Sequence, residues 1–179
     1  MFYISEISKT APVKFHTILQ KKTYRILQNL NIPFERVSTD EAVTMKDCLG
    51  INKKLDMEMV KTLFLCNRNE TEFYLFITAG DKPFRSGDFS SALNISRVSF
   101  APVELTEKML GVKIGAVTVF SAVLDKNNKI KVIFDKDVAD KEYCGCSDGT
   151  ITGYMKIKTK HIINKFLPFT GHIPVIIEV

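Results

Sequence analysis

The sequence has few of the residues that most often build cofactor sites, and it has no long apolar run. It contains no tryptophan, three histidines and four cysteines among 179 residues. No apolar run reaches the roughly 18 residues that a membrane-spanning helix requires. The first fifteen residues mix charged with apolar side chains, unlike a signal peptide. The protein is therefore expected in the cytoplasm, with no membrane partner.

Familiar catalytic and metal-binding motifs are also missing. The chain contains no G-x-S-x-G, G-x-x-x-x-G-K-[ST], H-E-x-x-H or G-x-G-x-x-G segment, which excludes the enzyme classes built on them. Only Cys144 and Cys146 are close together, and C-x-C without a second ligand pair is a poor zinc signature. We expect structural thiols and no metal or other cofactor, and neither cysteine has an identifiable base that would make it a nucleophile.

The composition that is present fits one globular domain. Hydrophobic residues make up 45% of the chain and charged residues 25%, and the mean hydropathy is +0.03, all ordinary values. No repeat or Pro/Gly/Ser-rich linker divides the sequence, so a single domain over residues 1–179 is predicted. The net charge of +5 permits a polyanionic partner without requiring one.

Hydrophobic periodicity predicts alternating helices and strands. Helices are expected at 14–30, after a turn within 40–50, at 89–93, at 103–110 and at 158–166. Strands are expected at 34–38, 61–66, 73–79, 97–100, 116–124, 129–135, 150–157 and 174–179, with hairpins joining 61–66 to 73–79 and 116–124 to 129–135. Because both hairpins and crossovers occur, the fold class is α/β with a mixed sheet.

Three features of this pattern are candidate functional elements. Lys61 opens an apolar strand, where its side chain either reaches into a cleft or is a solvated strand end. Gly115 lies between a helix exit and the next element, where free backbone amides bind an anionic oxygen or the chain makes only a tight turn. The small and polar residues of 143–152 predict a loop. His16 and His161 are expected to have surface or packing roles.

Four ordered segments resemble the YbaK / prolyl-tRNA editing domain family, especially its freestanding ProX-like members. They are Val60-Lys61-Thr62-Leu63-Phe64-Leu65, Arg97-Val98-Ser99-Phe100-Ala101, Leu110-Gly111-Val112-x-x-Gly115-Ala116-Val117-Thr118 and Thr170-Gly171-His172-x-Pro174. The resemblance spans about residues 26–179. It implies a single α/β domain with a curved mixed sheet, and a cleft for the aminoacylated 3′ end of a tRNA.

The resemblance also implies roles for individual residues. Lys61 matches a strand-start lysine that engages the terminal nucleotide or the aminoacyl group, and Gly115 with Thr118 matches a loop whose amides face the ester. Water is the implied nucleophile, assisted by a ribose hydroxyl of the substrate. The implied substrate-binding residues are Ala116, Val117, Cys146, Asp148, Thr152 and His172.

The chain departs from the family pattern at several positions. Val119 and Ile114 stand where the family often has proline, and Gly145, Cys146 and Gly149 stand where ProX-like members often carry His-Pro and Asn. Cys144, Ser147 or Asp148 are the neighbours available to substitute in binding.

The leading hypothesis is a trans-acting deacylase for proline tRNA mischarged with alanine or cysteine, with prolyl-tRNA synthetase as a possible partner. Lys21, Lys22 and Arg25 share the polar face of the first helix and are candidates for contacting the tRNA. Two alternatives are a non-catalytic sensor of aminoacyl-tRNA or amino acid that regulates a partner, and a hydrolase for another small acyl ester. The oligomeric state stays open.

Overall fold

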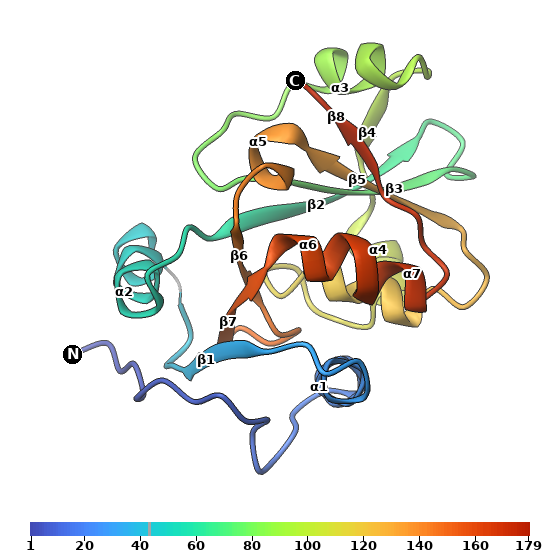
Figure 1. The fold of residues 1–179 in the computed structure, drawn as a ribbon. Helices are drawn as coiled ribbons and strands as arrows, with labels where there is room; N and C mark the ends of the chain where they lie inside the picture. The colour runs from blue at the N-terminus through green and yellow to red at the C-terminus, as the bar shows by residue number, and fades with distance from the viewer. Residues whose placement is uncertain (43) are drawn as a thin grey trace.

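The computed structural model describes residues 1–42 and 44–179, which form two β-sheets with flanking helices (Figure 1). The five-stranded sheet has the order β4-β2-β3-β5-β8, with bounds Val98–Phe100, Val60–Asn67, Phe73–Ala79, Ile130–Asp135 and Val175–Ile177. The three-stranded sheet has the order β1-β7-β6, with bounds Phe34–Ser38, Gly153–Lys158 and Tyr143–Ser147. This arrangement confirms the α/β class.

Strand direction makes the larger sheet mixed. β2 pairs antiparallel with β3 and with β4, whereas β5 pairs parallel with β3 and with β8. The smaller sheet is antiparallel throughout. A bridge between Met59 and Gly145 joins the two sheets, so the single curved sheet implied by the resemblance is divided into two connected parts.

The helices cover both sheets. In Figure 1, α1 lies beside β1, α2 lies beyond the opposite end of β1, and α3 lies near the C-terminus. Their bounds, with those of the shorter elements, are α1 Ile18–Asn29, α2 Met45–Leu55, α3 Ser86–Leu93, α4 Val103–Leu110, the 3₁₀ helix Val119–Leu124, α5 Lys136–Ala139, α6 Thr159–His161, the π-helical turn Ile162–Phe166 and α7 Leu167–Phe169. No helix in the described ranges is long and apolar enough to cross a membrane.

Alternation along the strands of the larger sheet divides the interior into two main cores. Phe64, Leu75 and Phe134 belong to the first core, which also holds the buried residues of α1 and the 3₁₀ helix. Leu65 and Phe76 belong to the second core. Successive side chains of a strand point to opposite faces, so the three central strands β2, β3 and β5 each contribute to both cores. A third, smaller core lies between α2 and the three-stranded sheet.

The first helix is shorter than its sequence pattern predicts. It begins at Ile18 because Thr17 is the N-cap and accepts a hydrogen bond from Gln20 N. Ile18 is exposed, whereas Leu19 and Leu27 are buried. The strand predicted at 34–38 and the helix predicted at 103–110 are confirmed, the latter ended by Gly111 at φ +65°. The predicted turn over 40–50 includes residue 43, which lies outside the described residues.

The strand predicted at 116–124 is wrong. Val119–Leu124 is a 3₁₀ helix, and β5 pairs with β3 and β8 instead of forming a hairpin with it. Because apolar residues fill nearly every position of this segment and its first half is buried, periodicity alone could not distinguish a strand from a helix.

The loop predicted over 143–152 is also partly wrong, because Tyr143–Ser147 is strand β6. Cys144 and Cys146 alternate into the first core, while Gly145 faces Met57 and Glu58. A Cβ at position 145 would lie 2.6 Å from Met57 Sδ and 2.8 Å from the Glu58 carbonyl oxygen. The close approach of these two segments therefore requires glycine at position 145. Because glycine is depleted in strands, the sequence pattern gave little indication of β6.

Candidate functional site

The largest hollow near the predicted site is the Gly115 pocket, which has a volume of about 690 Å³. Three segments form it: the loop after α4, the loop between β6 and β7, and the residues that begin α1. The lining residues are His16, Thr17, Glu41, Glu107, Gly111, Val112, Lys113, Ile114, Ala116, Gly149, Thr150, Ile151 and Thr152. The predicted residues Ala116 and Thr152 therefore lie on its wall.

Gly115 lies between the lining residues Ile114 and Ala116 and does not itself line the pocket that is named after it. Its φ of +97° is a conformation that residues with a side chain rarely adopt. A Cβ there would meet only Ile151 Cγ2, at 3.9 Å, so the two loops lie in van der Waals range of each other. Ala116 N–H donates to the Lys113 carbonyl. Within the described part of the chain, no hydrogen bond is made by the amides of Gly115 and Val117, which lie next to the pocket on either side of Ala116.

Asp148 lies behind the pocket rather than in it. It is 2% exposed and accepts hydrogen bonds from Gln20 Nε2 at 2.8 Å, Tyr24 Oη at 2.9 Å and Thr150 Oγ1 at 2.7 Å. Burial and, next, the Asp148 carboxylate raise the pKa of Tyr24 far above its ordinary value. The carboxylate thus ties α1 to the pocket loop, and the substrate contact that the resemblance implies for Asp148 stays a prediction.

Thr118 and Cys146 are also buried beneath the loops. Thr118 Oγ1 donates to the Ser147 carbonyl at 2.7 Å, which joins the start of the 3₁₀ helix to the end of β6. A hydrogen bond with Cys144 and then burial raise the pKa of the Cys146 thiol. Val117 is half-buried and packs against the first core. These three side chains support the pocket wall from the protein interior. The raised pKa keeps the Cys146 thiol protonated.

Sequence reasoning missed several residues of the pocket wall. His16 and Thr17 lie at the start of α1, and Glu41 and Glu107 bring two carboxylates to the rim. His16 falls within the helix expected at 14–30, but the observed α1 begins only at Ile18. The available signal was Thr17 followed by Gln20, an N-cap pattern that places the helix start after His16. No local pattern could have placed Glu41 or Glu107 there, because tertiary packing alone brings their segments together.

Lys61 lines a different hollow, the Lys61 pocket, of about 420 Å³. Its lining residues come from α2, β2, the end of β3 and the start of β6: Cys48, Leu49, Asn52, Glu58, Met59, Val60, Lys61, Ala79, Gly80, Asp81, Val138, Lys141 and Tyr143. Among the described residues, none lines both pockets. The roles that the resemblance implies for Lys61 and Gly115 stay predictions, and Lys61 lies at a hollow separate from the one beside Gly115.

Ion pairs of Lys82 fix the chain segment next to Lys61. Lys61 Nζ donates to the Lys82 carbonyl, while Lys82 Nζ lies 2.9 Å from Asp135 Oδ2 and 2.7 Å from Asp137 Oδ2. Asp135 is buried and also accepts from Thr78 Oγ1. Hydrogen bonds to Asp135 and then Asp137 raise the pKa of Lys82. The strand-end lysine thus sits beside an ion-pair network, not beside the Gly115 amides.

His172 lies in neither of these pockets. Its ring is 4% exposed, with Nε2 2.9 Å from Asp125 Oδ2 and Nδ1 2.9 Å from Thr170 Oγ1. Asp125 also accepts from the amides of Lys129 and Ile130 at the start of β5. Nε2 therefore joins the C-terminal segment to the turn before β5, while Nδ1 bonds Thr170 within that segment, so both ring nitrogens have partners and the substrate contact through His172 stays a prediction.

The three basic residues of α1 lie along one side of the helix. Lys21 and Arg25 are exposed and Lys22 is half-buried, while Thr17 at the start of the same helix lines the Gly115 pocket. The basic side chains therefore belong to the element that forms one wall of that pocket. Among residues 1–42 and 44–179, no group of three His, Cys, Asp or Glu side chains is arranged to hold a metal ion.

Comparison with known proteins identifies related sequences. The family described as the aminoacyl-tRNA editing domain matches residues 39–164, a range that contains Lys61 and both pocket loops but neither α1 nor His172. The prolyl-tRNA editing protein ProX of Acetoanaerobium sticklandii is 25% identical over 119 residues, which cover 64% of this chain and 70% of that protein.

Solved structures share the fold at low sequence identity. A scaffold protein made by computational epitope grafting aligns with a TM-score of 0.67 and 15% identity, covering 92% of this chain and 99% of its own. A protein described as a candidate trans-editing enzyme for prolyl tRNA synthetase aligns with a TM-score of 0.64 and 16% identity, again covering 92% and 99%. These likenesses confirm the fold.

The family match carries the functional assignment. It covers well over half of the chain and includes β2, the Gly115 loop, β6 and β7. Members of the family are typically hydrolases that deacylate aminoacyl-tRNA, so this chain is an enzyme of that kind and aminoacyl-tRNA is its substrate class. On this evidence, the chain belongs to the aminoacyl-tRNA editing domain family.

Proposed function

We propose that the protein is a trans-acting deacylase that hydrolyses the ester between alanine or cysteine and proline tRNA. The observation that carries the proposal is a hollow of about 690 Å³ lined by Ile114 and Ala116, beside the backbone amides of Gly115 and Val117. The name of the Acetoanaerobium relative supports proline tRNA as the substrate. The proposal treats residues 1–179 as one editing domain that acts in the cytoplasm.

The proposed reaction needs no side-chain nucleophile. A water molecule, assisted by a ribose hydroxyl of the terminal nucleotide, attacks the ester carbonyl carbon. The amides of Gly115 and Val117 donate to the carbonyl oxygen as it becomes negative, which stabilises the transition state. The carbon–oxygen bond to the ribose then breaks, and the tRNA hydroxyl and a free amino acid are released.

Other residues would position the substrate. Ala116, Val117 and Thr152 shape the space for a small side chain, and a steric sieve of this kind rejects cognate proline by shape. Lys61 would engage the terminal nucleotide from the neighbouring pocket, and Lys21, Lys22 and Arg25 would contact phosphates of the acceptor stem. Binding through such contacts weakens as salt concentration rises. Prolyl-tRNA synthetase is the partner that would supply the mischarged tRNA.

The test is release of amino acid from proline tRNA charged in turn with alanine, cysteine and proline. We expect rapid loss of alanine or cysteine, with proline retained. Gly115→Ala should slow the release by forcing the donor loop out of its φ of +97°, whereas Gly87→Ala, on the exposed face of α3 with nothing within 4 Å of its Cβ, should not. Equal release of all three amino acids would overturn the assignment of proline tRNA editing.

A sensor that binds aminoacyl-tRNA without hydrolysis is the second candidate. One observation favours it: position 145 has no room for the histidine side chain that ProX-like relatives often carry there, because Met57 and Glu58 lie too close. A sensor would bind the charged tRNA, release no amino acid, and lose only affinity when Lys61 is replaced. Intact binding without turnover in the same assay would establish this second function in place of the first.

A further inference from the structure

Lysine and arginine residues are concentrated in two segments of the chain. Residues 7–34 contain five of them and residues 149–177 contain four, and neither segment contains an aspartate or a glutamate. Of the 25 basic and 20 acidic residues, 16 basic and all 20 acidic residues belong to the rest of the molecule. The net positive charge of the chain therefore comes entirely from these two segments.

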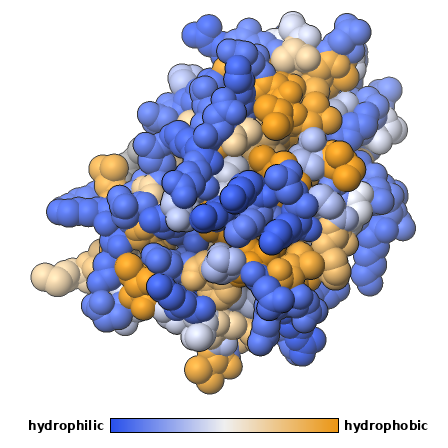
Figure 2. Space-filling model, viewed as in Figure 1, coloured by the Kyte–Doolittle hydropathy of each residue, from blue (hydrophilic) through white to orange (hydrophobic). Residues whose placement is uncertain are grey.

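The fold brings the two segments together. Leu19 of α1 shares the first core with Ile162 and Phe166 of the C-terminal helical segment, residues 159–169. The 3₁₀ helix lies between them, because it packs against α1 and the centroid of its Phe120 ring is 4.9 Å from that of the Phe166 ring. Figure 1 shows the C-terminal helical segment at the front of the molecule with α1 below it. In the same view, Figure 2 shows hydrophilic residues over both elements.

The basic side chains on these two elements have no acidic partners within the chain. Lys160 and Lys165 of the C-terminal helical segment are exposed, and so are Lys21 and Arg25 of α1. Among residues 1–42 and 44–179, the ion pairs include none of these four side chains. We call these four residues the basic face. No ion pair has to break before a phosphate approaches it.

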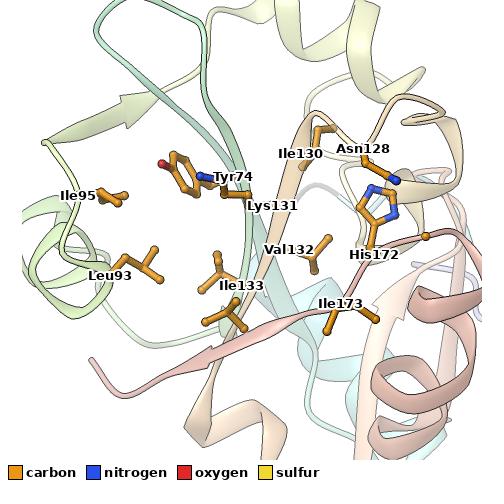
Figure 3. Close-up of a pocket in the computed structure, with 12 residues that line it drawn as sticks. Tyr74, Leu93, Ile95, Asn128, Ile130, Lys131, Val132, Ile133, His172 and Ile173 are labelled. Atoms are coloured by element: carbon orange, nitrogen blue, oxygen red, sulfur yellow. The ribbon is translucent and has the colours of Figure 1, made fainter.

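The hollow on the opposite side of the larger sheet differs in this respect. It has a volume of about 280 Å³, and its one charged lining residue is Lys131, which lies beside Tyr74 in Figure 3. Lys131 Nζ is 3.5 Å from a carboxylate oxygen of Glu72 and 5.5 Å from the centroid of the Tyr74 ring. Because its own chain already supplies these partners, this lysine is less available to a polyanion than the basic face is.

The charge of the C-terminal helical segment is also concentrated locally. Burial lowers the pKa of the His161 ring, and the neighbouring lysines lower it further. These neighbours are Lys165, Lys160 and Lys158. Lys158 Nζ has one long ion pair, at 3.9 Å from Glu142, which is weak. Because the lowered pKa keeps His161 neutral at pH 7, the positive charge here belongs to the lysines and does not change near neutral pH.

We propose that the C-terminal helical segment is a second RNA-binding element, which together with α1 holds the double-stranded acceptor stem of a tRNA by its phosphates. Lysine and arginine side chains bind phosphate oxygens through charge-assisted hydrogen bonds. Double-stranded RNA is recognised mostly by its shape and its backbone. A surface of unpaired cations drawn from two neighbouring helices is complementary to such a backbone.

The basic face is also correctly placed for the proposed reaction. Thr17, at the start of α1, lines the Gly115 pocket. Lys21 and Arg25 follow four and eight residues later, which places them about 6 Å and about 12 Å further along the helix axis. A stem that lies along α1 therefore directs its 3′ end toward the pocket.

Phosphate contacts fix the position of the RNA but carry no sequence information. The basic face should therefore bind an uncharged tRNA as tightly as a charged one, whatever the sequence of the stem. The proposal rests on the proposed function for its ligand, a tRNA. It adds that the amino acid and the tRNA sequence are selected elsewhere in the protein.

The test measures binding of the full chain to an uncharged RNA hairpin that contains the acceptor stem of proline tRNA. Fluorescence anisotropy gives the dissociation constant between about 50 and 200 mM salt. Lys160→Gln/Lys165→Gln should weaken binding by about tenfold at the lowest salt. The same double variant should reduce the slope of log K against log salt by about 2, or about 1 for each lost phosphate contact.

A matched control removes two cations from another part of the surface. Arg68→Gln/Arg85→Gln changes two exposed arginines, one in the turn between β2 and β3 and one immediately before α3. This variant should change neither the affinity nor the slope. The proposal is wrong if Lys160→Gln/Lys165→Gln binds like the unmodified chain, or if both double variants lose affinity equally.

A hairpin with a scrambled stem sequence tests the mode of binding. It should bind within about twofold of the proline stem, because phosphate contacts are independent of sequence. A preference for the proline stem that disappears in Lys160→Gln/Lys165→Gln would show that these lysines read bases, and it would overturn the proposal.

Deacylation assays separate this proposal from the proposed function. With charged tRNA, Lys160→Gln/Lys165→Gln should raise KM by about tenfold with little change in kcat, because the lysines bind the stem and not the ester. If the unmodified chain releases no amino acid while hairpin binding depends on the two lysines, the proposed function fails and the basic face stands. If deacylation is normal and hairpin binding is insensitive to the lysines, the basic face fails and the proposed function stands.

Discussion

The Gly115 pocket and the Lys61 pocket are built in different ways. Backbone groups dominate the first: Gly115 and Gly149 both have positive φ, and neutral donors around Asp148 fix its loops. Side chains dominate the second, where Lys61 lies next to the ion pairs of Lys82. Two residues that match one site in the family pattern can therefore lie at separate hollows of the structure.

Strand alternation explains the separation. Lys61 is on the same face of β2 as Leu63 and Leu65, which pack in the second core. Ala116 and Val117 pack against the first core, on the opposite face of that sheet. A contact between Lys61 and a substrate in the Gly115 pocket therefore requires a substrate that reaches both faces of the sheet.

The largest expected effect comes from removing the carboxylate behind the Gly115 pocket. Asp148→Ala leaves the donors of Gln20, Tyr24 and Thr150 without an acceptor, so the free energy of unfolding should fall by roughly 3 kcal/mol. Urea denaturation measures this change. Asp148→Asn, which keeps one acceptor oxygen, should cost clearly less, and equal losses for the two variants would contradict the account of the network.

The second prediction concerns the backbone donors. Gly115→Ala should lower kcat for deacylation by about 100-fold, the effect of losing an oxyanion donor, while stability falls by only about 1 kcal/mol because the Cβ itself has space. Single-turnover kinetics and urea denaturation measure the two effects. A loss of stability large enough to account for the lost activity would show that Gly115 acts through folding alone.

The third prediction distinguishes the two pockets by their kinetics. Lys61→Met should raise KM about tenfold through a lost contact with the terminal nucleotide, with kcat changed by less than about twofold. Lys46→Met, which removes a lysine charge that lines neither pocket, serves as the control. A fall in kcat that matches the fall in kcat/KM would instead place Lys61 at the reacting ester.

The smallest expected effect is a pH dependence of the free energy of unfolding that comes from Lys82, the neighbour of Lys61. Pairing with Asp135 and Asp137 raises the pKa of Lys82 above its ordinary value of 10.5, so its contribution to stability is complete below pH 10.5 and is lost as pH rises through the folded-state pKa. The stability difference between the unmodified chain and Lys82→Met should narrow above pH 10.5, by about 1 kcal/mol or less. Urea denaturation between pH 8 and pH 11 measures it, and a constant difference would contradict the assignment.

Local sequence patterns predicted most of the secondary structure. The apolar runs of β2 and β3, the strand range 34–38 and the helix range 103–110 all gave elements that the structure confirms. The pattern failed where its periods were ambiguous, as in Val119–Leu124, and where small residues concealed a strand, as in Tyr143–Ser147. In both segments burial by distant elements, not local propensity, selects the conformation.

The candidate site also combines features that the sequence predicted with features that only the tertiary structure revealed. The sequence by itself determined the family, the glycine loop and the strand-start lysine, because these depend on residue identity and local spacing. Only the tertiary structure decided that Asp148 and Thr118 lie behind the wall, that His172 joins the β5 turn, and that Lys61 occupies its own pocket. The physical reason is that the direction of a side chain depends on strand pairing and on packing between segments far apart in the chain, which local spacing does not encode.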